Sequence, residues 1–142
     1  MAEIVILDTG PLGRIAHPRA NVEIAAWLER LLESGAVVVV PEIADYELRR
    51  NLPLEGLLTS VARLDQLKAA LTYLPITTQV MLRAAELWAE ARRGGIPTAA
   101  VHELDGDAIL AAQALQVGGV VATENVGHLS RFVEARNWTE IS

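Results

Sequence analysis

A short apolar run that ends in an acid constrains the fold more than any other stretch of the chain. Ile4 to Leu7 is uninterrupted apolar sequence, and Asp8 follows it directly, before Thr9, Gly10 and Pro11. Four apolar residues bounded by turn-forming residues predict a buried strand in the middle of a parallel sheet. In open α/β sheets, ligand sites lie beyond the carboxyl ends of such strands. Asp8 therefore marks a site at this edge or caps the next helix, and the stretch alone favours neither.

Length and composition predict one soluble domain over residues 1–142. A chain of 142 residues, 51% of them hydrophobic, suits one domain with one core. There is no cysteine, which excludes disulfides and thiolate metal sites and fits a reducing compartment. No apolar run approaches the roughly 18 residues that would span a membrane, and no signal pattern begins the chain. We expect a cytoplasmic protein that does not enter a membrane.

Strand patterns and helix patterns alternate along the whole chain. Strands are expected at residues 4–7, 36–40, 73–76, 120–122 and 138–141. Helices are expected at residues 21–34, 41–50, 55–72, 78–93 and 106–116, with residues 14–20 a loop or short helix and a further short helix within 128–135. This alternation predicts a three-layer α/β/α sandwich with a mainly parallel central sheet of four to five strands.

Acidic side chains fall next to three of the predicted strand ends. Asp8 ends the first strand, Glu47 lies two turns into the helix after the second, and Asp105 and Asp107 stand at the start of the helix before the fourth. Carboxylates gathered at one edge of a parallel sheet repel one another, and a hard divalent cation relieves that repulsion. A set of oxygen ligands favours Mg²⁺ or Mn²⁺ over Zn²⁺. The pattern predicts a metal site at the carboxyl edge of the sheet.

Two of these acids have alternatives. Asp105 and Asp107 would point about 200° apart if both were helical, so they could not face one ion. Asp105 is then expected to cap the helix or to bind from outside its first turn. For Glu47 the alternative is a solvated helix face or an ion pair with Arg50.

The charge balance does not identify a partner. A net charge of −6 argues against binding polyanions through a general positive field. Eleven of the twelve basic residues are arginine, with Lys68 the single lysine, and arginine favours bidentate phosphate contacts. Compositional bias and surface ion pairing explain the same observation more simply.

Four stretches, taken together, resemble a known family. They are Ile6-Leu-Asp-Thr-Gly-Pro-Leu12, Pro41-Glu-Ile-Ala-Asp-Tyr-Glu-Leu-Arg-Arg50, Asp107-Ala-Ile-Leu-Ala-Ala-Gln-Ala114 and Val121-Ala-Thr-Glu-Asn-Val-Gly-His-Leu129. In this order they resemble the PIN domain, the nuclease fold of the VapC toxins of toxin–antitoxin pairs. The resemblance implies an α/β/α sandwich whose acids bind Mg²⁺ or Mn²⁺ and hydrolyse RNA phosphodiesters.

The resemblance also implies roles for particular residues. The catalytic and metal-binding acids would be Asp8, Glu47 and Asp107. The polar residues that orient the site would be Thr9, Thr123 and Asn125. The chain departs from the family at a fourth acid, for which Glu124 and Asn125 stand in the matching loop and Asp105 is a further candidate. Arginines near these motifs could hold RNA phosphates, namely Arg14, Arg49 and Arg131.

These observations lead to two functional hypotheses. The first is a Mg²⁺- or Mn²⁺-dependent endoribonuclease that cleaves single-stranded RNA as the toxin of a toxin–antitoxin pair. Such a protein would have a cognate antitoxin and would form a homodimer through helices 55–72 and 78–93. The second is a catalytically inactive PIN-like domain that binds a protein or RNA. Among the histidines, His128 best fits the family loop.

Overall fold

Five parallel strands form the centre of the molecule, in the order β3-β2-β1-β4-β5. The computed structural model describes residues 3–19, 21–95 and 101–142, and of residues 101–103 only the helical backbone. The strands are β1 (Ile4–Leu7), β2 (Val37–Pro41), β3 (Thr72–Leu74), β4 (Val120–Thr123) and β5 (Ala135–Asn137). The α-helices are α1 (Thr9–Ala16), α2 (Val22–Glu33), α3 (Glu42–Asn51), α4 (Leu58–Ala70), α5 (Thr78–Arg93), α6 (Val101–Val117) and α7 (Val126–Leu129).

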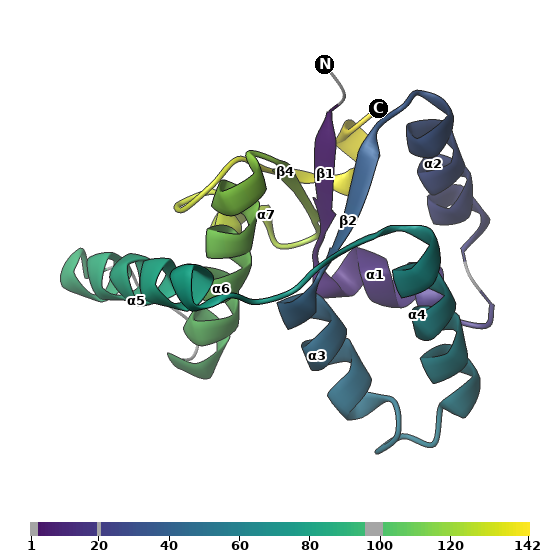
Figure 1. The fold of residues 1–142 in the computed structure, drawn as a ribbon, viewed down its shortest axis with the longest axis horizontal. Coiled ribbons are helices and arrows are strands. Elements are labelled where there is room, and N and C mark those ends of the chain that lie inside the picture. The colour runs from purple at the N-terminus through teal and green to yellow at the C-terminus, as the bar shows by residue number, and fades with distance from the viewer. Residues whose placement is uncertain (1–2, 20, 96–100) are drawn as a thin grey trace.

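Helices cover both faces of this sheet, as the sequence predicts. Val5 and Leu7 point from β1 into a core made with α1, α2 and α4. Ile6, Val39 and Val121 point to the opposite face, where α6 packs. The α5 helix lies outside α6 and shares a third apolar cluster with it. Figure 1 shows α4 and α5 on opposite sides of the strands, so the layered α/β/α fold class is confirmed.

The topology brings three helices to the carboxyl edge of the sheet. Because β1 is the central strand, its end lies between the ends of β2 and β4. The α1 helix begins directly after β1, and α3 begins directly after β2. The α3 helix contacts both α1 and α6, so side chains from all three helices can meet at this edge.

Three predicted elements differ from the structure. Residues 9–16 form α1 where the sequence suggests a turn, because Asp8 caps the helix and Pro11 fits its first turn. The α6 helix begins at Val101, so the prediction that Asp105 caps it is wrong. The last strand is Ala135–Asn137, and Trp138 begins a short 3₁₀ helix. The Trp138 indole is buried against that of Trp27.

The described helices were compared with the length and hydrophobicity of a membrane-spanning helix. In the part of the chain that the structure describes, no helix combines the length and the apolar character that crossing a bilayer would require.

Candidate functional site at the carboxyl edge of the sheet

Asp8 is both a helix cap and a site carboxylate. Its Oδ1 accepts a hydrogen bond from the Thr9 backbone N–H at 2.8 Å, which caps α1. Its Oδ2 accepts one from the Thr123 hydroxyl at 2.7 Å, and that hydroxyl in turn accepts from the Asn125 N–H at 2.8 Å. The carboxylate is thereby held between the ends of β1 and β4. The two interpretations of Asp8 describe one geometry.

Glu47 reaches the same place from α3. Its Oε1 accepts a hydrogen bond from the Thr9 hydroxyl at 3.0 Å. Its Oε2 lies against Gly106 of α6, so closely that a Cβ added to Gly106 would be 2.5 Å from that oxygen. The absence of a side chain at Gly106 therefore makes room for Glu47.

Asp107 completes the group from the first turns of α6. It lines one polar cleft of about 260 Å³ together with Asp8 and Glu47. His128 of α7 borders the same cleft, with Nδ1 3.9 Å from Asp107 Oδ2. Three carboxylates from three separate segments thus share one cavity.

Burial disfavours the charged form of all three carboxyl groups, and the charge of Asp8 adds to this effect for Glu47 and Asp107. Burial raises the pKa of Asp8, against the hydrogen bonds that lower it. Burial also raises the pKa of Glu47, with a further rise from the charge of Asp8. Burial and the charge of Asp8 raise the pKa of Asp107 to about 6, although His128 and Arg131 act in the opposite direction. A bound cation would relieve this repulsion.

The donor set suits a hard divalent ion. Mg²⁺ takes one or two carboxylates and keeps several water ligands, and three acids and Asn125 border the cleft. Among the residues that the structure describes, no three Asp, Glu or His side chains already surround one point closely enough to hold an ion. The oxygen donors of these residues therefore match the preference of Mg²⁺ or Mn²⁺. Water ligands, or an inward movement of the side chains, would complete the coordination of the ion.

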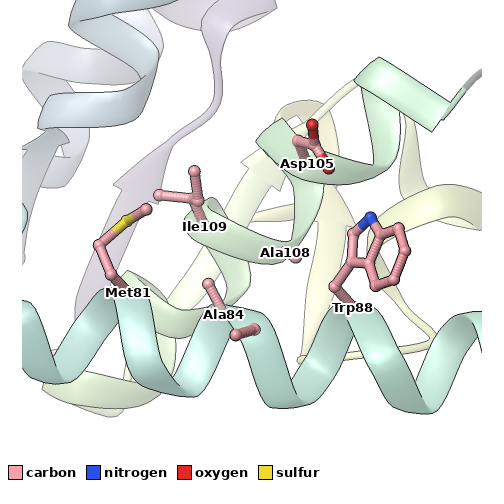
Figure 2. A pocket seen from close by; sticks show the side chains of 7 residues that line it. Met81, Ala84, Trp88, Asp105, Ala108 and Ile109 are labelled. Carbon is pink, nitrogen blue, oxygen red and sulfur yellow. The ribbon is translucent and has the colours of Figure 1, made fainter.

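Asp105 is not brought to this cleft. It lies on the side of α6 that faces α5, where it lines a separate, mainly apolar pocket with Met81 and Trp88 (Figure 2). Two residues along a helix turn a side chain by about 200°, which is why Asp107 and Asp105 face different cavities.

Glu124 is likewise engaged elsewhere. Its two oxygens accept hydrogen bonds from Arg14 Nε at 2.7 Å and Nη2 at 2.9 Å. Glu124 borders a second cavity beside the cleft rather than the cleft itself. The Arg14 guanidinium neutralises it, so it does not add a fourth free carboxylate to the group.

Two other predicted arginines do not line the cleft. Arg49 bridges Asp45 and Asp65, at 3.0 Å and 2.7 Å, on the side of α3 that faces α4. Arg131 donates from Nε to the His128 carbonyl at 2.6 Å, which places its charge near Asp107 without exposing it to the cavity.

Sequence reasoning gave no role in the site to three residues at this cleft. Arg50 borders the cleft where Arg49 had been expected, and its only sequence signal is the three-residue spacing from Glu47. His128 borders the cleft too, and the family loop already singles it out among the histidines. Gly106 carries no sequence signal, because its role arises only when α6 packs against α3.

Comparisons with known proteins agree with this geometry. Residues 5–132 match the family model described as the PIN domain. No curated protein matches the chain.

Several solved structures share the fold. A chain of VapBC2 from Rickettsia felis, bound to a promoter DNA fragment, is 18% identical with a TM-score of 0.79, covering 95% of this chain and 98% of that one. A chain of FitAcB from Neisseria gonorrhoeae is 25% identical with a TM-score of 0.72, covering 96% and 99%. A chain of DNA-bound VapBC from Salmonella typhimurium is 20% identical with a TM-score of 0.76, covering 97% and 99%.

Proposed function

Because the chain belongs to the PIN domain family, we propose that it is a Mg²⁺- or Mn²⁺-dependent endoribonuclease that cleaves single-stranded RNA. The observation that carries this proposal is the convergence of Asp8, Glu47 and Asp107 on one polar cleft at the carboxyl edge of the sheet. Asp8 and Asp107, with Glu47, would hold the ion. When bound there, the ion would lower the pKa of a water molecule and polarise the scissile phosphate.

The protein residues have separate tasks in this proposal. The hydroxyls of Thr9 and Thr123 orient Glu47 and Asp8 by single hydrogen bonds. Asn125 borders the cleft and fixes the Thr123 hydroxyl through its backbone N–H. Arg50 borders the cleft as well and can donate to a phosphate oxygen.

We further propose that the protein is the toxin of a toxin–antitoxin pair. Complexes named VapBC and FitAcB are among the structures that share this fold over nearly the whole chain. A cognate antitoxin and a homodimer are part of this proposal. Co-purification with the product of an adjacent small reading frame tests the antitoxin, and failure to bind that product would count against the toxin role.

The ribonuclease function is tested by cleavage of labelled single-stranded RNA in Mg²⁺ or Mn²⁺. Asp8→Asn is expected to abolish cleavage while keeping the fold, because asparagine can still cap α1. Asp107→Asn is expected to do the same. Asp105→Asn is the matched control, since it removes an acid from the same helix but from another cavity. Equal losses in Asp105→Asn and Asp107→Asn would contradict the assignment.

Metal binding has a readout that does not depend on activity. A ligand that binds the native state alone stabilises it by about 2.7 kcal/mol at a hundredfold excess over its dissociation constant. The melting temperature should therefore rise across a Mn²⁺ titration of the wild type and of Asp105→Asn, and stay nearly flat in Asp107→Asn. A flat wild-type titration would count against a metal site.

A second candidate function is a catalytically inactive PIN domain that binds a protein or RNA. The observation in its favour is that no three metal-binding side chains of the described residues already enclose one point. RNA binding without cleavage, together with a flat Mn²⁺ titration, would support this alternative.

A further inference from the structure

A second cavity adjoins the acid cleft and has the opposite charge. It is bordered by Arg14 of α1, by His17 and Arg19 after α1, and by Glu124 after β4. Gly10 borders both this cavity and the acid cleft, so the two are neighbours. Two arginines and one glutamate border this cavity, whereas three acids and one arginine border the acid cleft.

The basic groups of this cavity have donors to spare. Arg14 uses Nε and Nη2 on Glu124, and a guanidinium carries five N–H groups, so three remain. His17 Nδ1 accepts a hydrogen bond from the Arg19 backbone N–H at 3.0 Å, which leaves its Nε2–H to donate outward. Among the described residues, the Arg19 guanidinium forms no ion pair.

Glu124 has a definite part in this arrangement. Its bidentate contact orients the Arg14 guanidinium, and its Oε1 lies close to Gly10. A carboxylate and a phosphate present the same pair of oxygens to an arginine fork. A phosphate can therefore accept hydrogen bonds from the three N–H groups of Arg14 that Glu124 does not use. It can also displace Glu124 and accept from Nε and Nη2.

We propose that the cavity of Arg14, His17 and Arg19 binds a phosphodiester of the RNA strand next to the one that lies in the acid cleft. This inference rests on the proposed ribonuclease function, because it names how that site holds a longer strand. It explains how a chain of net charge −6 can hold a polyanion: the strand meets local positive charge directly beside the acids.

Binding of a fluorescein-labelled oligouridylate, measured by anisotropy over a salt series in the Asp8→Asn background, tests the pocket. Each phosphate neutralised on a single strand contributes about 0.7 to the slope of log affinity against log salt. Arg14→Gln and Arg19→Gln should each weaken binding several-fold and lower the slope by about that amount. Arg83→Gln, on α5 and paired with Glu86, is the matched charge control.

Two further variants separate a phosphate contact from a general change of charge. Glu124→Gln should tighten binding, because it removes the competing carboxylate. Adding Arg14→Gln to Glu124→Gln should weaken binding again, although the net charge of the double variant equals that of the wild type. If the double variant binds as tightly as Glu124→Gln alone, the Arg14 contact is refuted.

Kinetics distinguish failure of this inference from failure of the nuclease proposal. With the active protein, Arg19→Gln should raise KM for the long substrate, leave kcat unchanged and leave dinucleotide cleavage unaffected. If RNA is cleaved but Arg19→Gln behaves like Arg83→Gln, the pocket fails and the nuclease function stands. If no RNA is cleaved but the salt slopes change as expected, the pocket stands and the nuclease function fails.

Discussion

At the scale of single residues, the site depends on side chains that serve two purposes. Asp8 caps α1 through Oδ1 and offers Oδ2 to the Thr123 hydroxyl. The Thr9 hydroxyl holds Glu47, and its backbone N–H holds Asp8. One short segment at the end of β1 therefore positions two of the three carboxylates, so a change there affects helix and site together.

Gly106→Ala should separate helix stability from site geometry. Alanine favours a helix interior over glycine by about 0.5–1 kcal/mol, so the fold should be as stable or slightly more stable. The new Cβ would be 2.5 Å from Glu47 Oε2, so the Glu47 carboxylate must move. We expect reduced cleavage and a smaller rise in melting temperature with Mn²⁺.

The control for this prediction is Gly127→Ala in α7. A Cβ added to Gly127 would meet nothing within 4 Å. If Gly106→Ala responds to Mn²⁺ as fully as Gly127→Ala and the wild type do, the close approach of Glu47 does not matter for the metal site.

Asp107 should make the metal-free protein less stable as pH rises. Its pKa is raised from 3.8 to about 6 in the folded state, so between these values the folded protein binds more protons than the unfolded chain. The free energy of unfolding then falls as pH rises from about 4 to 6. In EDTA, the melting temperature of Asp107→Asn relative to that of the wild type should increase as pH rises from about 4 to 6. A stability difference that is independent of pH would contradict the raised pKa.

At the scale of elements, α3 presents one face to the site and another to α4. Asp45 is only 6% exposed, and it accepts hydrogen bonds from Arg49 of α3 and from Lys68 of α4 at 3.2 Å. Arg49 also reaches Asp65 of α4. This network joins the two helices on the side of α3 that faces away from the acid cleft.

Arg49→Gln should therefore weaken the fold rather than RNA binding. The loss is expected at about 1–2 kcal/mol, between the values for exposed and buried ion pairs, because Arg49 is about one-third exposed and Asp45 is buried. Urea denaturation measures this loss, and oligouridylate anisotropy measures binding. A loss of RNA affinity with unchanged stability would restore the phosphate-binding role that the sequence suggested.

The first four strands could be predicted because local patterns determine them, whereas the last strand ends just before the residue where the sequence pattern placed its start. The apolar run before Asp8 and the β-branched run before Pro41 are short apolar segments that end at turn-forming residues, which is a local strand signal. The start of α6 could not be placed, since Asp105 is a good cap in isolation and the helix extends four residues before it. Which carboxylate Arg14 or Arg49 would bind depends on how α1, α3 and α4 pack, and no local pattern encodes that.

At the scale of the whole molecule, the predicted dimer surface is divided. Leu58 of α4 is 70% exposed and Leu82 of α5 is 63% exposed, but these helices cover opposite faces of the sheet (Figure 1). Leu87 of α5 is buried against α6, so it is not available to an interface. The two helices of one protomer therefore do not form one continuous patch, and an isologous contact must use one of them.

The α5 helix is the better candidate for a homodimer. It carries exposed Met81 and Leu82 beside the apolar pocket that Trp88 shares with α6, whereas the apolar face of α4 is mostly turned into the core. We expect light scattering at micromolar concentration to give twice 15.3 kDa, and Leu82→Asp to give the monomer without loss of stability. Leu58→Asp, at a leucine of α4 that is at least as exposed as Leu82, should leave the dimer intact. A wild type of 15.3 kDa would contradict dimerisation, and dissociation by Leu58→Asp alone would move the contact to α4.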